Sequence, residues 1–499
     1  MGITLAHLLP HHSLPEKIAS LVINGLAIDS RQIQPGCVFL AYQGTQHHGG
    51  DYVESAIKNG AIAIMLDADY ADLKKIITTF SSTPIIPVSH LIQEISAIAG
   101  RFYENPSHSL DVIGVTGTNG KTSSTHYIAQ LLEHLGTRCG VMGTVGQGFY
   151  NQLQETGLTT RDPLAVQHDL AQLMQQDAKV VAMEVSSHAL VQYRVQDVSF
   201  KLAAFTNLTR DHLDYHGDMA SYGAAKARLF QHLNLQYAVI NLDDPFSDTL
   251  LTGLSSDVQV LVYSLLNPHP TIPSIWLENI MYQSHGMSAL LHTPWGHGNI
   301  QVPLLGRFNL SNVLLAMASV LLLGNSFDAV LSAIPKLVGV AGRMQCFGNN
   351  NQPLVIVDYA HTPDGLEQAL SSLKEHCKGI LWCVFGCGGD RDKGKRPLMA
   401  KVAESQQAQC IITNDNPRTE DPLAIIADIV AGFSPHIKPL IEPDRTKAIA
   451  LALARAHPDD IIVVAGKGHE DYQLIGTQRL SYSDIETVKQ LLHLSQMNP

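Results

Sequence analysis

A glycine-rich segment at residues 114–123, GVTGTNGKTS, carries the residue types that bind phosphate. Glycines at a turn between a strand and a helix let several backbone N–H groups point at one anion, beside the positive end of the helix dipole. Lys121 adds a mobile cation, and the hydroxyl of Thr122 can ligate a magnesium ion. The segment is therefore predicted to bind the phosphates of a nucleotide.

The segment departs from the usual pattern G-x-x-x-x-G-K-[ST] at one position. That pattern has a glycine five residues before Gly120, where this chain has Val115, and Gly114 lies one residue earlier. A glycine-rich turn with an accidental lysine is the alternative interpretation. An apolar strand-like run precedes the turn, and apolar residues at helical spacing follow it from Tyr127. This order favours a variant nucleotide loop.

Further polar residues follow apolar runs of the same kind. Glu184 ends the run VVAME and could hold a metal or orient a water, although the serines after it could equally cap a helix. His212 and His216 lie in TNLTRDHLDYHGD, where oxygen-rich magnesium coordination fits better than zinc, since no glutamate separates the histidines as in helical zinc motifs. His212 could also be a hydrogen-bonded histidine without a ligand role. Lys226 lies on a predicted helix. Taken alone, a lysine on a helix is predicted to be exposed to solvent.

Other candidates come from loops before and after these runs. Asn309 and Asn312 are three residues apart at a helix start and could contact a base or ribose, or cap the helix. Arg343 could reach nucleotide phosphates from a different domain, so that domain closure would complete the site, and Asp358 follows shortly after. Ser30, in the segment DSR, could contact a sugar-like ligand or belong to a capped surface turn.

The last loops combine cations and carboxylates. Arg391 and Arg418 can each bind a carboxylate through two hydrogen bonds, and Glu470 can bind an ammonium group. Opposite charges at neighbouring strand ends suit a zwitterionic amino acid. Surface ion pairs are the alternative, and composition does not separate the two interpretations.

The length and composition of the chain indicate what kind of protein positions these residues. Its 499 residues predict about three domains. The formal net charge of -12 disfavours a general nucleic-acid binder, because such a protein needs a basic surface.

The seven cysteines lack paired spacing and fit reduced thiols. The N-terminus shows no pattern of a secretion signal, so none is expected. The most apolar window, residues 313–323, is too short for a membrane span and predicts a buried helix. We expect a cytoplasmic, monomeric protein without membrane insertion.

Apolar runs alternate with helical segments along most of the chain, as in α/β proteins with parallel sheets. We expect three domains: a small N-terminal α/β module (1–90), a central P-loop ATPase domain with a parallel sheet (91–339), and a C-terminal doubly wound Rossmann-like domain (340–499). Ligands of such sheets bind beyond the carboxyl ends of the strands. The residues that follow each apolar run are therefore the candidates for ligand binding.

The motifs together resemble those of one family. GTNGKTS, EVSSHALVQYR, TNLTRDHLDYHGD, GRFNLSN, DYAHTPDGL, GCGGDRDKGKRP, DNPR and GKGHED occur in the order found in the ATP-dependent Mur ligases. The resemblance covers nearly the whole chain, and DNPR resembles the signature of members that use diaminopimelate rather than lysine. Val115 is ordinary for the family, whose loop resembles G-T-x-G-K-[ST].

The resemblance implies roles for specific residues. The ATP-binding set is Gly117, Thr118, Asn119, Gly120, Lys121, Thr122, Ser123, Asn309, Arg343 and Asp358, and the magnesium set is Thr122, Glu184, His212 and Lys226. Lys226 stands where the family carries a carbamylated lysine. Lys121, Lys226, His212 and Glu184 are the implied catalytic residues. The UDP-sugar dipeptide is assigned to Ile28, Ser30, Thr159, Thr160, Ser186, Gln192 and Arg194, and the incoming amino acid to Arg391, Asp415, Asn416, Pro417, Arg418, Gly466 and Glu470.

The implied reaction is the ATP-dependent addition of meso-diaminopimelate to the γ-carboxylate of D-glutamate in UDP-N-acetylmuramoyl-L-alanyl-D-glutamate. It would proceed through an acyl phosphate, with Mg²⁺, in the synthesis of peptidoglycan precursors. Two alternatives stay open. A folylpolyglutamate synthase would also form an amide with ATP but would not need DNPR. A non-catalytic P-loop switch would bind nucleotide without joining substrates.

Overall fold

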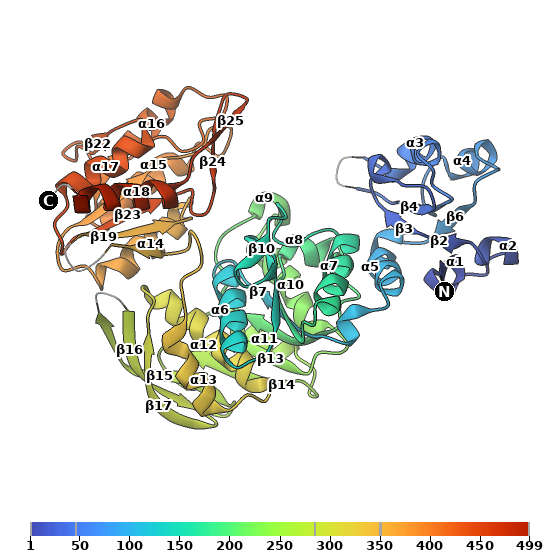
Figure 1. Ribbon diagram of the computed structural model, residues 1–499, viewed down its shortest axis with the longest axis horizontal. Coiled ribbons are helices and arrows are strands. Elements are labelled where there is room, and N and C mark those ends of the chain that lie inside the picture. Colours follow the sequence, from blue (N-terminus) through green and yellow to red (C-terminus); the bar gives the residue numbers. More distant parts are fainter. Residues whose placement is uncertain (1, 45–46, 284–285, 349–351, 498–499) are drawn as a thin grey trace. The chain divides into compact units, whose positions relative to one another are not determined.

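The computed structural model describes residues 2–44, 47–283, 286–348 and 352–497 (Figure 1). The chain divides into two compact units. Unit 1 comprises Met1–Ser264, Pro268–Ser274 and Leu315–Ser326, and unit 2 comprises Leu265–Asn267, Ile275–Leu314 and Phe327–Pro499. Both units are α/β structures built on parallel sheets, as the alternation of apolar runs and helical segments predicts.

The N-terminal part of unit 1 holds a four-stranded, fully parallel sheet. Its strands are β3 (Gly25–Ala27), β4 (Cys37–Ala41), β5 (Ala63–Asp67) and β6 (Ile85–Val88). All five residues of β4 are buried, because Val38 and Leu40 belong to one apolar cluster and Phe39 and Ala41 to another. Around the sheet lie β1 (Ile3–Thr4), α1 (Leu5–Leu8), α2 (Glu16–Ala19), β2 (Val22–Ile23), η1 (Ser30–Gln32), η2 (Gly49–Tyr52), α3 (Val53–Lys58), α4 (Leu73–Thr79) and α5 (Leu91–Phe102).

A larger sheet forms the centre of unit 1, in the order β10-β9-β8-β11-β7-β12-β13-β14. Its strands are β7 (Asp111–Thr116), β8 (Cys139–Gly143), β9 (Gly146–Phe149), β10 (Gln152–Gln154), β11 (Val180–Glu184), β12 (Phe200–Phe205), β13 (Tyr237–Asn241) and β14 (Gln259–Ser264). Strands β8, β11, β7, β12, β13 and β14 are parallel. The register places Glu184 beside Val115 and Phe205 beside Thr116, so three strands end at the glycine-rich segment.

Helices connect these strands over both faces of the sheet (Figure 1). They are η3 (Pro106–His108), α6 (Lys121–His134), α7 (Pro163–Gln175), α8 (Ser187–Val191), α9 (Leu213–His216), α10 (Met219–Ala227), η4 (Arg228–Gln231) and α11 (Ser247–Gly253). The predicted helix after the glycine-rich segment is confirmed as α6. It begins at Lys121, directly after Gly120, whose φ of 86° lies in the left-handed region.

Unit 2 contains an antiparallel group of strands and a second parallel sheet. The antiparallel strands are β15 (Ser274–Gln283), β16 (Gly286–Thr293) and β17 (Gly296–Val302). Along the chain they are followed by α12 (Arg307–Leu322), whose residues from Leu315 onward belong to unit 1, and by α13 (Phe327–Ala333) and η5 (Ile334–Lys336). The predicted buried helix near residues 313–323 is confirmed, because Val313–Leu321 of α12 are buried. None of the helices in the described residues is long and apolar enough to span a membrane.

The second parallel sheet has the order β18-β19-β23-β20-β21-β22. Its strands are β18 (Gln345–Phe347), β19 (Leu354–Asp358), β20 (Leu381–Phe385), β21 (Gln409–Ile412), β22 (Leu440–Ile441) and β23 (Ile461–Ala465), with only β18 antiparallel. The helices are α14 (Pro363–Lys374), α15 (Lys395–Ser405), α16 (Pro422–Val430), α17 (Arg445–Arg455) and α18 (Asp484–Met497), and β24 (Tyr472–Ile475) pairs with β25 (Gln478–Ser481). Strand β23 lies between β19 and β20, so residues far apart in sequence meet at one edge.

His232 gives unit 1 a predicted sensitivity to acid. Its ring packs edge-on against Phe200 with 5.0 Å between ring centroids, and burial lowers the pKa of His232 to about 4. In the unfolded chain the pKa of His232 is near 6.5, so between pH 4 and pH 6.5 the unfolded state binds a proton that the folded state does not. The contribution of the neutral His232 ring to the free energy of unfolding is therefore fully present above pH 6.5 and is lost as the pH falls toward 4.

We expect His232→Gln to lose less stability on acidification than the wild type. Lowering the pH from 7.5 to 5.0 should reduce the free energy of unfolding of the wild type by about 2 kcal/mol more than that of the variant. Urea titrations followed by circular dichroism at both pH values measure the difference. An equal loss in the two proteins would contradict the prediction.

Candidate active site

The glycine-rich segment forms a tight loop between β7 and α6. Strand β7 continues to Thr116, so Val115 is a buried strand residue and the loop proper is 117–120. Gly117 has a φ of 149°, and a Cβ there would come within 1.8 Å of the Thr206 hydroxyl oxygen. Only glycine fits at this position. The segment after β12 also holds the loop, because Asn207 Oδ1 accepts the N–H of Asn119 at 2.9 Å.

Two lysine side chains meet at this loop. Lys121 Nζ donates to the carbonyl oxygens of Gly117 and Thr118, both at 2.8 Å. Lys226 Nζ donates to the Gly117 oxygen at 2.7 Å and lies 4.3 Å from the ring centroid of Tyr222. Lys226 is 1% exposed, so the solvated lysine that its residue type alone favours is wrong. Burial, and secondly the charge of Lys121, lower the pKa of Lys226 well below its usual value.

Glu184 is a buried carboxylate whose described partners are all neutral. Its Oε2 accepts from the hydroxyls of Thr122 at 3.0 Å and Thr144 at 3.2 Å, and its Oε1 accepts from the Thr144 N–H at 2.8 Å. No ion pair joins it to a cationic side chain in the described parts of the chain. A buried carboxylate beside a hydroxyl oxygen suits a hard cation such as magnesium. Thr144, which directly follows β8 and its glycine, was not singled out from the sequence.

His212 belongs to an aromatic cluster near the loop. It precedes α9 with a φ of 52°, and its ring lies 4.9 Å from that of His188 and 6.3 Å from that of Tyr222, between centroids. Tyr222 is also the ring beneath Lys226. Burial, together with the neighbouring histidines, lowers the pKa of His188 to about 4. His212 and Lys226 thus share a neighbour, and Thr122 and Glu184 are in direct contact.

The described residues contain no group of three or more His, Cys, Asp or Glu side chains that could hold a metal ion. The predicted magnesium set requires only two such side chains, Glu184 and His212, because its other members are a hydroxyl and a modified lysine. The donor chemistry of Thr122 and Glu184 fits magnesium, and the set as a whole stays a prediction.

The residues predicted to hold the sugar dipeptide in the central part form one network. Thr160 donates to the Glu184 carbonyl at 2.9 Å and accepts from the Ser186 N–H at 3.1 Å. Arg194 donates to the Thr160 carbonyl at 2.6 Å and to the amide oxygen of Gln192. Thr159 contacts Thr144 through their hydroxyls at 2.9 Å. The network therefore connects these side chains to the carboxylate at the loop. Ser186 also caps α8, so both interpretations of this serine hold.

Ile28 and Ser30 line a cavity of about 660 Å³ in the N-terminal part, beyond the ends of β3 and β4. The other lining residues are Asp29, Arg31, Phe39, Tyr42, Gly44, His47, Gly49, Tyr52 and Ser55. Asp29 caps η1 and pairs with the exposed Arg31 at 2.7 Å, so the capped-turn interpretation of this segment also holds.

Three predicted nucleotide contacts lie in unit 2. Asn309 is 2% exposed, and its side chain donates to the Leu305 carbonyl at 2.8 Å. The Asp358 carboxylate accepts the N–H groups of Met344 at 2.7 Å and Ala360 at 2.9 Å, and burial raises the pKa of Asp358. The guanidinium of Arg343 lies 4.5 Å from the ring centroid of Tyr359. Asp358 therefore fixes the backbone that carries Arg343.

The predicted amino-acid site is assembled at the ends of β20, β21 and β23. Arg418 donates to the Gly389 carbonyl at 2.9 Å, and a Cβ on Gly388 would lie 2.8 Å from Arg418 Nη1 and 3.8 Å from Arg391 Cγ. Both arginines therefore flank Gly388. A Cβ on Gly466, whose φ is 119°, would lie 2.6 Å from the Asp415 carboxylate. This close approach requires glycine and brings β23 against the DNPR loop.

Comparison with known proteins reveals the family. Residues 22–103 match the Mur ligase family catalytic domain, residues 115–320 the Mur ligase middle domain, and residues 342–468 the Mur ligase glutamate ligase domain. The chain belongs to the Mur ligase family. The sequence-based prediction of this family is thereby confirmed.

Two relatives of this Mur ligase are named UDP-N-acetylmuramoyl-L-alanyl-D-glutamate--2,6-diaminopimelate ligase. The protein of Coxiella burnetii is 46% identical over 95% of this chain and 96% of its own length. That of Pseudomonas aeruginosa is 48% identical over 96% of both. A solved structure of a protein with the same name shares 35% identity and a TM-score of 0.74, covering 99% of this chain and all of the other.

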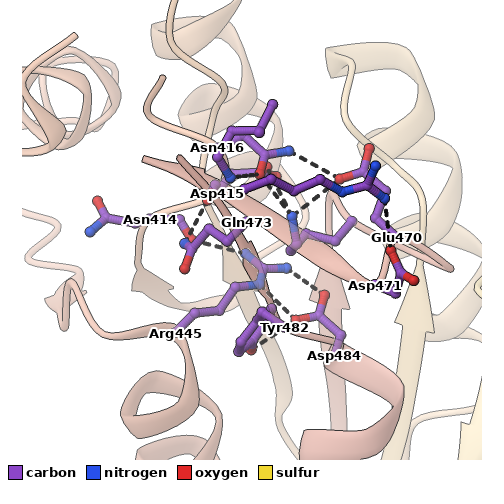
Figure 2. A network of polar contacts seen from close by, with 12 residues as sticks. Asn414, Asp415, Asn416, Arg445, Glu470, Asp471, Gln473, Tyr482 and Asp484 are labelled. Carbon is purple, nitrogen blue, oxygen red and sulfur yellow. Dashed lines mark hydrogen bonds and ion pairs between the residues drawn. The ribbon is translucent and has the colours of Figure 1, made fainter. Parts of the chain in front are cut away.

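A buried ion pair lies beneath the predicted amino-acid site of this Mur ligase (Figure 2). Arg445 at the start of α17 binds both carboxylate oxygens of Asp484 at the start of α18, each at 2.7 Å, and both side chains are essentially unexposed. Arg445 also donates to the carbonyls of Ala465 at 2.9 Å and Asn414 at 3.4 Å. The pair thus fixes the ends of β23 and of the chain after β21. The sequence did not single out either residue.

We expect Asp484→Asn to destabilise unit 2 by about 3 kcal/mol or more, because it leaves the buried Arg445 without a counter-charge. Glu486→Gln, two residues further along α18, removes an exposed ion pair with Lys489 and should change stability by at most about 0.5 kcal/mol. The tryptophans 276, 295 and 382 all lie in unit 2, so urea titration followed by their fluorescence reports its unfolding. Equal effects of the two substitutions would contradict the assignment.

Proposed function

We propose that this protein is the ATP-dependent ligase that joins meso-2,6-diaminopimelate to the D-glutamate of UDP-N-acetylmuramoyl-L-alanyl-D-glutamate, in the synthesis of peptidoglycan precursors. The observation that carries the proposal is the similarity, over nearly the full length, to relatives with that name. The glycine-rich loop and the two arginines beside Gly388, Arg391 and Arg418 of DNPR, support it. We assign the protein to the cytoplasm, where nucleotide-linked precursors are made.

The chemistry explains why a phosphate loop and a carboxylate acceptor are combined. A carboxylate reacts poorly with an amine because its leaving group would be oxide. Transfer of the γ-phosphoryl group of ATP to the glutamate γ-carboxylate forms an acyl phosphate, from which phosphate leaves when the amine of diaminopimelate attacks. Lys121 at the loop would stabilise the charge that develops on the transferred group. Thr122, Glu184, His212 and a modified Lys226 would hold magnesium, which offsets charge on the phosphates.

We divide the roles among three domains with boundaries near residues 90 and 340. The cavity with Ile28 and Ser30 would bind the UDP part, and the Thr160–Arg194 network would bind the sugar dipeptide. The loop at 117–123 would bind the phosphates of ATP, and Asn309 and Arg343 stay predicted nucleotide contacts. The Arg418 region of the last domain would bind diaminopimelate. Separate binding domains fit a reaction whose catalysis depends on positioning three substrates.

Phosphate release from ATP tests the function. We expect release only when the UDP-sugar dipeptide is present, and full turnover only with diaminopimelate rather than L-lysine or glutamate as acceptor. Lys121→Ala should reduce turnover at least about 100-fold, and oxygen-18 in the glutamyl carboxylate should appear in the released phosphate. Stimulation by glutamate with a folate acceptor would instead indicate a folylpolyglutamate synthase. Hydrolysis independent of substrates would indicate a P-loop switch.

We further propose that Lys226 is carbamylated. Its lowered pKa favours the neutral amine, which attacks carbon dioxide to form a carbamate and release a proton. The product would place an anion beside the loop, where Lys226 now donates to the Gly117 carbonyl.

We expect the wild type to lose activity in buffer depleted of carbon dioxide and to regain it when bicarbonate is added. Lys226→Ala should be at least about 100-fold less active and should not respond to bicarbonate. The exposed Lys58, which pairs with Glu54, provides the control Lys58→Ala, which should behave as the wild type. Unchanged activity of the wild type after depletion would argue against carbamylation.

A further inference from the structure

A buried lysine lies behind the carboxylates of the predicted amino-acid site. Lys467 follows β23 and its side chain is 0% exposed. Its Nζ donates to Asn416 Oδ1 and to Glu470 Oε2, both at 3.1 Å, and lies 3.8 Å from Asp415 Oδ1. Its ammonium also lies 5.5 Å from the ring centroid of Tyr472. A buried ammonium requires such compensation, because removing it from water is costly.

Of the carboxylate and amide side chains that Lys467 contacts, that of Glu470 is the most exposed, and Asn416 is buried. The side chain of Glu470 is 18% exposed and that of Asp415 is 10% exposed, whereas Lys467 is closed off. Figure 2 shows Asn416 and Glu470 facing one another, and Asn416 Nδ2 donates to Glu470 Oε2 at 3.0 Å. A ligand can therefore reach the Glu470 carboxylate but not the lysine. Lys467 would act through the side chains that it contacts, as a positioning residue.

Lys467 also sets the charge of the group. Asp415 and Glu470 carry two negative charges and Lys467 one positive charge, so the three sum to -1. This net charge matches a single ammonium group, while Arg391 and Arg418 beside Gly388 offer cations for a carboxylate. A neutral residue at 467 would leave -2, which favours a more cationic ligand.

We propose that Lys467 positions Asn416 and Glu470 and sets the charge of this site, so that the site accepts the zwitterionic end of an amino acid in preference to a lone ammonium. The inference rests on the proposed function, because it concerns the acceptor of that reaction. Diaminopimelate ends in an ammonium and a carboxylate, whereas the side chain of L-lysine ends in an ammonium alone. The two acceptors therefore report on the charge of the site directly.

Steady-state kinetics of the full chain test this inference, with each substrate varied in turn while the other two are saturating. Lys467→Met should raise KM for diaminopimelate at least tenfold and leave KM for ATP within twofold. The ratio of kcat/KM for diaminopimelate to that for L-lysine should fall at least tenfold. Lys467→Arg, which keeps the charge, should retain the preference of the wild type.

Lys447 of α17 provides the matched control, because it is an exposed lysine in the same unit, with 72% of its side chain exposed. Lys447→Met should leave all constants within twofold. If Lys467→Met does not fold, Lys467→Gln replaces it as the neutral variant. Formation of the acyl phosphate, which needs no amino acid, should persist in each folded variant and shows that unit 1 is intact.

The outcomes separate the two proposals. If the wild type forms no amide with diaminopimelate, the proposed function fails. If it does, but the neutral and the charge-keeping variants have the same acceptor preference, the role of Lys467 is overturned. A neutral variant that raises KM for ATP and for diaminopimelate equally would also overturn it, because that result indicates general disruption.

Discussion

The parallel pairing of strands is the constraint on which both sites depend. Parallel strands that start in register also end together, so loops from distant parts of the chain meet at one edge. In unit 1 the register places the end of β11, with Glu184, and the end of β12 beside the end of β7, from which the glycine loop begins. In unit 2 the central β23 brings Gly466 against Asp415, which follows β21. Neither site could form from one segment alone.

The charges at these edges differ in how they are compensated. Arg445 and Asp484 neutralise one another completely, and this buried pair fixes the backbone beneath the site in unit 2. At the loop in unit 1, the buried Glu184 accepts hydrogen bonds from neutral groups, and the amine of the buried Lys226 donates a hydrogen bond to a carbonyl oxygen. Compensated charge supports a structure, whereas charge that lacks a counter-charge marks a place for a ligand or a modification. This contrast distinguishes the supporting residues from the proposed catalytic ones.

Much of the architecture could be predicted from the sequence because its signals are local. The uniformly apolar runs at β7, β11, β12 and β23 predicted buried parallel strands, and the structure confirms them. The glycines and Lys121 predicted a phosphate-binding loop, because a tight turn requires glycine and the lysine adds a cation that can bind phosphate. The order of motifs predicted the family, which the comparisons confirm. The roles of individual site residues and the domain boundaries stay predictions.

The sequence by itself thus determined the strands, the loop and the family, because these depend on residue type and spacing over a few residues. Only the tertiary structure decided which side chains are buried and what they contact. Lys226 looks like a solvated helical lysine until its helix packs against the loop, and Thr144 gains its contact with Glu184 only when β8 lies beside β11. Lys467 is one lysine among many until β21 and β23 bring Asn416 and Glu470 around it. Burial and electrostatic environment arise from residues far apart in the chain, so no local pattern encodes them.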